Sequence, residues 1–226
     1  MSNRKHSIRM LGLALVAVFA MSAVAASAAS AAQFHAGASP ASATATNEGA
    51  HVFTAGQVGN ISCSTATFKG ELVTTPASTL EVLPTYSSCT FLGLPTTVNM
   101  NGCKYLFNTP TGSPFTGTVS VRCPKVGGVR KVITFEVGAC KVEVPGHPAE
   151  GLEPAENQGL GTVTYTNNGS TPNRSVTVAA NVTGIKYTAT GVCNEFPGTR
   201  SDGHYVGTAH ATAEDETEVE VEAWIE

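Results

Sequence analysis

The residues that could hold a metal ion lie near the C-terminal end of the sequence. Glu218, Glu220 and Glu222 alternate with apolar residues in a stretch that ends at Trp224 and Ile225. On a β-strand these glutamates share one face, and such a carboxylate ladder could collect Ca²⁺ or a basic partner. Carboxylates spaced along a strand do not surround one point, so the pattern favours a solvated, charged strand face that discourages edge-to-edge pairing.

A second candidate metal site combines Asp202, His204 and His210. The two histidines have the same parity, but six strand residues separate them by roughly 20 Å, too far for one ion. A bulge at Gly207 could bring them closer, whereas a turn at residues 201–203 with exposed histidines is the interpretation we favour. The sequence therefore predicts no metal ligand and no cofactor.

Catalytic residue patterns are missing from the sequence. It contains no Gly-x-Ser-x-Gly, no His-Glu-x-x-His, no phosphate loop and no dinucleotide fingerprint. Glu71, Glu81, Glu136 and Glu143 could serve a glycosidase, but no two of them are marked as partners. The sequence therefore favours a protein without enzymatic activity and marks no catalytic residue. A secreted hydrolase with a loop-built site stays open as an alternative, with Pro145–Gly161 as the rim.

The cysteines predict a disulfide framework. Their number is even and none forms a Cys-x-x-Cys pair, which favours disulfides over a metal site. Segments 103–107 and 117–123 flank a turn, which brings their cysteines together at the open end of one hairpin. Cys63 and Cys89 fall in strands of the same half of the chain, and Cys140 and Cys193 then remain as the third pair. We therefore expect nearest-neighbour pairing, with Cys63 joined to Cys89, Cys103 to Cys123 and Cys140 to Cys193.

The first 31 residues are typical of a secretory signal peptide. Arg4, Lys5 and Arg9 precede an apolar run and a series of small residues. An uncleaved anchor over Leu11–Ala29 is the alternative, and the small residues favour cleavage. The remainder carries 10 basic and 17 acidic residues, a net charge of −7, which makes nucleic acid a poor candidate partner. We expect a secreted or cell-envelope protein without a membrane span after cleavage.

The rest of the chain predicts an all-β fold. Residues 32–51 are rich in Ala, Ser and Thr and are expected to form a disordered leader. From Val52 onward, short β-branched stretches separated by turn residues predict a disulfide-stapled β-sandwich. Similarity between Val98–Tyr105 and Ala180–Tyr187 suggests an internal duplication, with β-units at 52–130 and 131–226 that could also form one domain.

The cysteine-containing segments ISCSTATFKG, YSSCTFLG and NGCKYLF resemble those of secreted, cysteine-containing β-rich proteins of actinobacterial type. The resemblance covers about residues 52–226, points to no named family and implies no activity, ligand or site. We therefore expect an exported, non-catalytic β-module that acts by surface binding or structure on a cell-wall or other extracellular ligand. A carbohydrate- or peptide-binding sandwich is a further alternative; the aromatic residues available for stacking are Trp224, Tyr86, Tyr105, Tyr165, Tyr187 and Tyr205.

Overall fold

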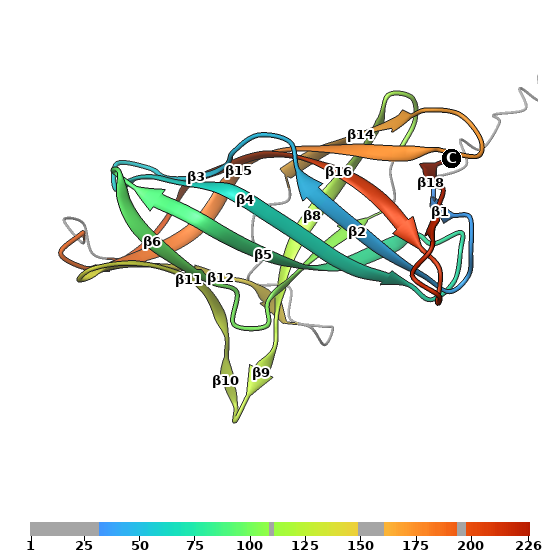
Figure 1. Cartoon of the computed structure of the whole chain (residues 1–226). Helices are drawn as coiled ribbons and strands as arrows, with labels where there is room; N and C mark the ends of the chain where they lie inside the picture. Colours follow the sequence, from blue (N-terminus) through green and yellow to red (C-terminus); the bar gives the residue numbers. More distant parts are fainter. Residues whose placement is uncertain (1–31, 109–110, 149–160, 194–197) are drawn as a thin grey trace, which may run out of the picture. The chain divides into compact units, whose positions relative to one another are not determined.

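The computed structural model describes residues 32–108, 111–148, 161–193 and 198–226. Within these ranges the chain consists of β-strands and turns (Figure 1), so the predicted all-β class is confirmed. The same ranges contain no helix long and apolar enough to cross a membrane. The predicted signal peptide at residues 1–31 and most of the loop 145–161 lie outside the described residues.

The described ranges form eighteen strands. In chain order they are β1 (Phe34–Ala36), β2 (Ala41–Asn47), β3 (His51–Ala55), β4 (Gly59–Leu72), β5 (Thr79–Phe91), β6 (Leu94–Asn99), β7 (Lys104–Asn108), β8 (Phe115–Cys123), β9 (Lys125–Val126), β10 (Val129–Arg130), β11 (Val132–Val137), β12 (Cys140–Pro145), β13 (His147–Pro148), β14 (Gly161–Asn168), β15 (Ser175–Gly191), β16 (Thr199–Glu214), β17 (Glu220–Val221) and β18 (Ala223–Ile225).

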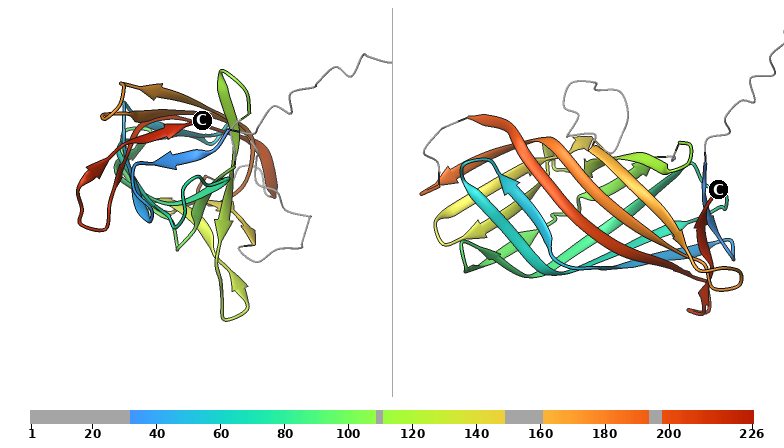
Figure 2. Two further views of the ribbon diagram at one scale, coloured as in Figure 1. Left: turned by 90° about the vertical axis from the view of Figure 1, so that its right-hand side faces the viewer. Right: turned by 90° about the horizontal axis from the view of Figure 1, so that it is seen from above.

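The main sheet closes on itself. One circuit of hydrogen-bonded neighbours runs β4, β5, β7, β8, β14, β15, β16, β2 and back to β4. A second circuit runs β4, β5, β6, β11, β12, β15, β16, β3 and back to β4. The long strands β4, β5, β15 and β16 belong to both circuits, and shorter strands complete each end (Figure 2). The facing layers enclose the core as in a sandwich, but they are joined into one continuous sheet.

Alternation of side chains explains how this sheet buries one face. β12 buries Cys140, Val142 and Val144 and leaves the residues between them partly exposed. β14 follows the same rule with Val163 and Tyr165. Because successive strand residues point to opposite faces, the inward-facing side chains of the strands in the two circuits meet inside the closed sheet.

The expectation of a disordered leader at residues 32–51 is wrong. These residues form β1, β2 and the first residue of β3, and β2 lies between β16 and β4. Composition misleads here because a strand with neighbours on both sides satisfies its backbone hydrogen bonds whatever its side chains are. Phe34, Ala36 and Ala41 are also buried, so the segment contributes to the core.

The two proposed β-units are one compact unit that comprises Ala31–Glu226. Strands from both sides of residue 130 pair with one another, for example β8 with β14 and β6 with β11. The two similar segments also have different environments. Residues 98–105 span the end of β6, a turn and the start of β7, whereas residues 180–187 lie within β15.

Three disulfides connect neighbouring strand ends. They join Cys63 to Cys89, Cys103 to Cys123 and Cys140 to Cys193, the same pairs that the nearest-neighbour argument selects. Cys63 and Cys89 are directly opposite each other in β4 and β5. All six cysteines belong to or pack against one hydrophobic cluster, so the disulfides reinforce one part of the core.

Strands β1 and β18 form a separate antiparallel pair that lies across one end of the closed sheet (Figure 2). Asn167 holds this pair by two hydrogen bonds of 2.8 Å to the backbone of Ile225. Arg174 forms an ion pair of 2.9 Å with Glu222 and lies 3.7 Å from the centre of the Trp224 ring. We call β1 and β18 together the end cap.

Candidate functional site

The interior of the closed sheet contains an apolar cavity with a volume of about 170 Å³. It extends from the end cap, where Phe34 and Ile225 line it, to Phe53 and Phe135. The residues that line it include no aspartate, glutamate, lysine or arginine. A cavity of this kind is the usual setting for an apolar small molecule, with orientation fixed by a few polar groups.

Small residues on two paired strands form one wall of the cavity. Inward positions of β16 hold Gly207, Ala209, Ala211 and Ala213. Ala211 is opposite Ala45 of β2, and Ala213 is opposite Ala43, so small side chains meet across the pair. A Cβ at Gly207 would overlap the imidazole ring of His51, so no larger residue fits there. The cavity exists because these positions supply little side-chain volume.

Aromatic residues of β16 itself and of four other strands contribute further lining. They come from β4, β5, β7, β14 and β16 and are Phe68, Tyr86, Tyr105, Phe107, Tyr165 and Tyr205. The ring of Tyr165 contacts Phe34 of the end cap edge-on, with 5.6 Å between centroids. These rigid rings face the small residues of β2 and β16 and leave a preformed space between them.

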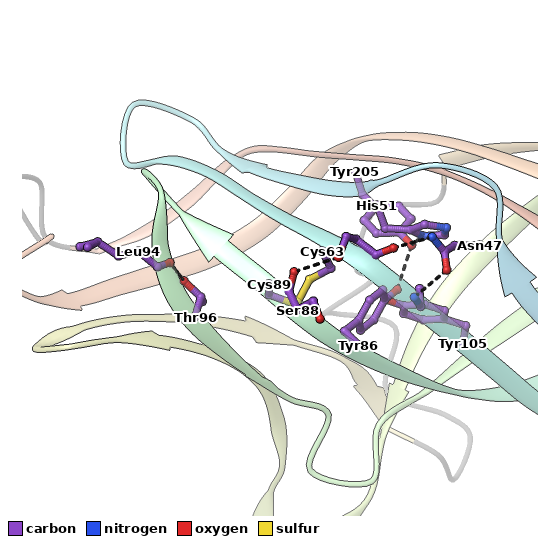
Figure 3. Close-up of a disulfide and its surroundings, with 12 residues drawn as sticks. Asn47, His51, Cys63, Tyr86, Ser88, Cys89, Leu94, Thr96, Tyr105 and Tyr205 are labelled. Carbon is purple, nitrogen blue, oxygen red and sulfur yellow. Dashed lines mark hydrogen bonds between the residues drawn. A yellow bond between two sulfur atoms is a disulfide. The ribbon is translucent and has the colours of Figure 1, made fainter.

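A chain of hydrogen bonds crosses the middle of this lining (Figure 3). His51 Nδ1 lies 2.5 Å from the hydroxyl of Tyr205, which lies 2.8 Å from that of Tyr86. The Tyr86 hydroxyl lies 2.9 Å from that of Tyr105. His51 Nε2 is 3.0 Å from the Thr208 carbonyl. His51 is 4% exposed, so these polar groups satisfy one another away from solvent.

The direction of these hydrogen bonds follows from the Thr208 carbonyl. A carbonyl only accepts, so Nε2 of His51 carries a proton, and in the neutral ring Nδ1 accepts from Tyr205. Tyr86 then donates to Tyr205, and Tyr105 donates to Tyr86. All four protons of the chain are engaged. Its open end is the Tyr105 oxygen, which retains capacity to accept a hydrogen bond.

Burial favours the neutral form of the four hydrogen-bonded side chains. It lowers the pKa of His51 below its ordinary value, and the hydrogen bond to Thr208 opposes that effect. Burial raises the pKa of Tyr105 to about 12, and it raises the pKa values of Tyr86 and Tyr205 well above the ordinary value. These shifts favour the uncharged form of each of the four side chains.

Tyr165 is different from the other cavity tyrosines. It is 3% exposed, and its hydroxyl is the one buried side-chain N or O atom in the described ranges without a hydrogen-bond partner. The hydroxyl lies over Gly117 of β8, where the missing side chain leaves room for it. Burial without compensation raises the pKa of Tyr165 far above the ordinary value for tyrosine.

The residues expected near a metal site have separate partners. His204 Nε2 is 2.7 Å from Asn181, and His210 is 3.8 Å from a Glu48 carboxylate oxygen. Asp202 accepts a hydrogen bond of 3.0 Å from Tyr187. Within the ranges given above, no group of three or more His, Cys, Asp and Glu residues could hold a metal ion.

The glutamates considered earlier lie apart from the cavity. Glu81 pairs with Arg122 at 3.0 Å, and Glu143 pairs with Lys141 at 2.6 Å. Glu222, which directly precedes β18 of the end cap, pairs with Arg174, and this interaction lowers the pKa of the Glu222 carboxyl. Glu222 of the glutamate-rich segment therefore helps to hold the adjacent strand β18 in place.

Of the aromatic residues considered for stacking on a carbohydrate, four tyrosines line the interior cavity: Tyr86, Tyr105, Tyr165 and Tyr205. Tyr86, Tyr105, Tyr165, Tyr187 and Tyr205 all lie on strands, and Trp224 is stacked on His35 in the end cap. Sequence reasoning missed His51 and the small-residue wall. The sequence contained a signal for this wall, because every second residue from 207 to 213 is small, namely Gly207, Ala209, Ala211 and Ala213.

Comparison of the chain with protein-family models, with curated proteins and with solved structures finds no match.

Proposed function

We propose that the protein is an exported, non-catalytic binding module that takes up one small apolar molecule in its interior cavity. The observation that carries the proposal is a preformed space of about 170 Å³ lined by apolar groups and by no charged side chain. The sequence analysis expected binding at the surface of the sheet, whereas this proposal places the ligand in its interior.

The volume sets the size of the ligand. An engineered apolar cavity of about 150 Å³ in another protein stays dry and binds benzene. The cavity here is slightly larger, so it accommodates a single six-membered ring with one substituent. A toluene molecule that buries seven carbons at about 0.8 kcal/mol each would bind with a Kd on the order of 0.1 mM.

The framework around the cavity favours a binding role because it is held open before a ligand arrives. The closed sheet leaves neither of its two circuits with a free edge, and three disulfides tie its strands together. Binding to a preformed site loses less conformational freedom than binding that must order the protein. Three disulfides also suit an oxidising compartment, which supports the proposal that the protein acts outside the cytoplasm.

The end cap supplies a route by which a ligand could enter. It is a two-stranded unit outside the closed sheet, held to it by a few contacts such as those of Asn167 and Arg174. Its residues Phe34 and Ile225 line the cavity, so displacing the cap would open the cavity at that end.

Calorimetric titration of the oxidised protein with toluene tests the proposal. We expect saturable binding of one molecule with a Kd near 0.1 mM. The matched control is the Ala211→Leu variant, in which the added side chain occupies the cavity and removes the binding. Absence of saturable binding up to the aqueous solubility of toluene, or equal binding by the control, would contradict the proposal.

A further inference from the structure

One end of the closed sheet exposes apolar side chains on its turns. At this end β5 and β15 finish and β4 begins, and the connections β3–β4, β5–β6 and β11–β12 lie there together with the segment that follows β15 (Figure 1, Figure 2). Leu92 and Leu94 of the β5–β6 turn are 75% and 59% exposed, and Val192 after β15 is 77% exposed. The Val192 amide donates to the Ala139 carbonyl at 3.2 Å, so it lies beside the β11–β12 turn. We call Leu92, Leu94 and Val192 the apolar tips.

The described residues of these four connections carry no charged side chain. They are residues 55–60, 91–95, 137–140 and 191–193. Charged side chains in the adjoining strands compensate one another. Arg200 pairs with Asp202 at 3.3 Å, Lys141 pairs with Glu143 at 2.6 Å, and Glu136 is opposite Lys141 in the β11–β12 register. A partner at this end therefore meets apolar tips without a net charge around them.

The other end of the sheet has the opposite character. β16 runs from Thr199 near the apolar tips to the far end, where acidic residues follow one another at the end of this strand and after it. They are Glu214, Asp215, Glu216, Glu218 and Glu220. One end of the protein thus favours water strongly, while the other presents apolar groups to it. Exposed apolar groups gathered in this way mark a surface that binds a protein or a membrane.

Leu92 occupies a backbone position that disfavours leucine. Its φ is 49° and that of Gly93 is 80°, so both central residues of this two-residue turn have positive φ. Such hairpin turns favour Asn-Gly, because a bulky L-residue is disfavoured at positive φ. At residues 101–102 and 127–128, with the same signs of φ, the chain has Asn-Gly and Gly-Gly. The leucine gains little burial in return for this conformation, which indicates a partner surface that buries it.

The size and arrangement of the apolar tips favour a lipid layer over a second copy of the chain. Three aliphatic side chains bury on the order of 300 Å², whereas a stable protein interface takes about 800 Å² from each partner. Tips on separate turns would also require a matching recess for each in a folded partner, and a fluid lipid layer requires none. The net charge of −7 on residues 32–226 opposes an anionic surface, so neutral headgroups fit best.

We propose that this end of the protein lies on a lipid layer with neutral headgroups, with the side chains of Leu92, Leu94 and Val192 among the acyl chains and the acidic end in water. The proposal does not depend on the interior cavity. The three side chains together have fewer carbons than a myristoyl chain, which binds membranes reversibly at about 10⁴ M⁻¹. We therefore expect a weak association, with a partition coefficient on the order of 10³ M⁻¹.

Sedimentation of the oxidised protein with phosphatidylcholine vesicles tests the proposal on wild type, Leu92→Asn and the control Val73→Asn. Val73 is 72% exposed but follows β4 at the acidic end. Asparagine suits positive φ, so Leu92→Asn should unfold at the same or a higher denaturant concentration than wild type. Its partition coefficient should nevertheless fall about tenfold. Val73→Asn should partition within twofold of wild type.

Two further readouts identify the end that meets the lipid. Trp224 is the only tryptophan of the chain and lies in the end cap, away from the apolar tips. Brominated phosphatidylcholine, which quenches tryptophan on contact, should therefore leave its fluorescence unchanged while the protein sediments with the vesicles. Replacing part of the lipid by anionic phosphatidylglycerol should not increase the partition coefficient, because the tips attract no negative charge.

Several outcomes would overturn the proposal. They are absence of sedimentation with phosphatidylcholine vesicles, equal partition of Leu92→Asn and wild type, and quenching of Trp224. Binding that requires phosphatidylglycerol would assign lipid contact to a basic surface such as the β9–β10 hairpin with Lys125. Self-association that Leu92→Asn abolishes, without vesicle binding, would assign the apolar tips to a second copy.

Discussion

Replacing Ala211 by leucine adds three carbon atoms to the wall of the interior cavity. Ala211 lies on the inward face of β16, opposite Ala45 of β2 and Val176 of β15. All three residues line the cavity, so the new side chain has unfilled space in front of it. The sign of the stability change therefore depends on whether that space exists.

The magnitude follows from the size of the side chain and of the cavity. Three buried carbons contribute about 2.4 kcal/mol, and ordering the leucine side chain costs about 0.5–1 kcal/mol, so the net gain is about 1.5–2 kcal/mol. At about 24 cal/mol per Å³, filling the entire 170 Å³ would stabilise by about 4 kcal/mol, which sets the ceiling. In a core that is already filled, the same change would destabilise the protein by about 1–3 kcal/mol.

Equilibrium unfolding in guanidinium chloride measures this difference. Ala66→Leu is the matched control, because Ala66 is fully buried in the same sheet and does not line the cavity. We expect Ala211→Leu to raise the free energy of unfolding and Ala66→Leu to lower it. Destabilisation by both substitutions would refute the existence of usable space beside Ala211.

Three other substitutions test separate parts of the structure. Replacing Cys140 and Cys193 by serine should lower the free energy of unfolding by about 4 kcal/mol, because their separation of 53 residues makes this the largest loop. His51→Gln should abolish a loss of stability on acidification below about pH 6.5, which denaturation at stepped pH values would record. Asn167→Ala removes two hydrogen bonds to Ile225 and should accelerate toluene exchange several-fold in NMR exchange spectra.

The sign of the pH effect follows from the lowered pKa of His51. The unfolded chain takes up a proton below about pH 6.5, whereas the folded protein does not until its lower pKa is reached. Stability is therefore complete above pH 6.5 and falls on acidification, by at most about 1.4 kcal/mol per pH unit. Equal pH dependence in wild type and His51→Gln would show that His51 is not buried neutral.

The predictions for the double serine variant and for Asn167→Ala would each be contradicted by a wild-type result. If the double serine variant were as stable as wild type, the disulfide at Cys140 would not restrict the unfolded chain. If Asn167→Ala exchanged toluene at the wild-type rate, entry would not involve the end cap.

Local features of the sequence were sufficient for part of the fold. Alternating β-branched residues predict the strands because side chains alternate across a strand wherever it lies in the sheet. Cys103 and Cys123 could be paired because β7 and β8 are a hairpin with a short connection. In both cases the deciding contacts lie within a few dozen residues of one another.

The cavity could not be predicted in the same way, because it depends on which distant strands become neighbours. Tyr86 and Tyr205 are 119 residues apart, and His51 and Tyr205 are 154 residues apart, yet their side chains are bonded. Only closure of the sheet brings them together. The prediction of a disordered leader at residues 32–51 failed for the same reason. Ala43 and Ala45 lie in a strand that is ordered by pairing with the distant strand β16 and with β4.

Intermolecular nuclear Overhauser effects between toluene and the protein test the central claim most directly. With methyl-labelled alanine, we predict contacts from the ring protons of bound toluene to the methyl groups of Ala211 and Ala213, and none to that of Ala66. Contacts confined to exposed residues, or no contacts at saturating toluene, would contradict binding inside the closed sheet.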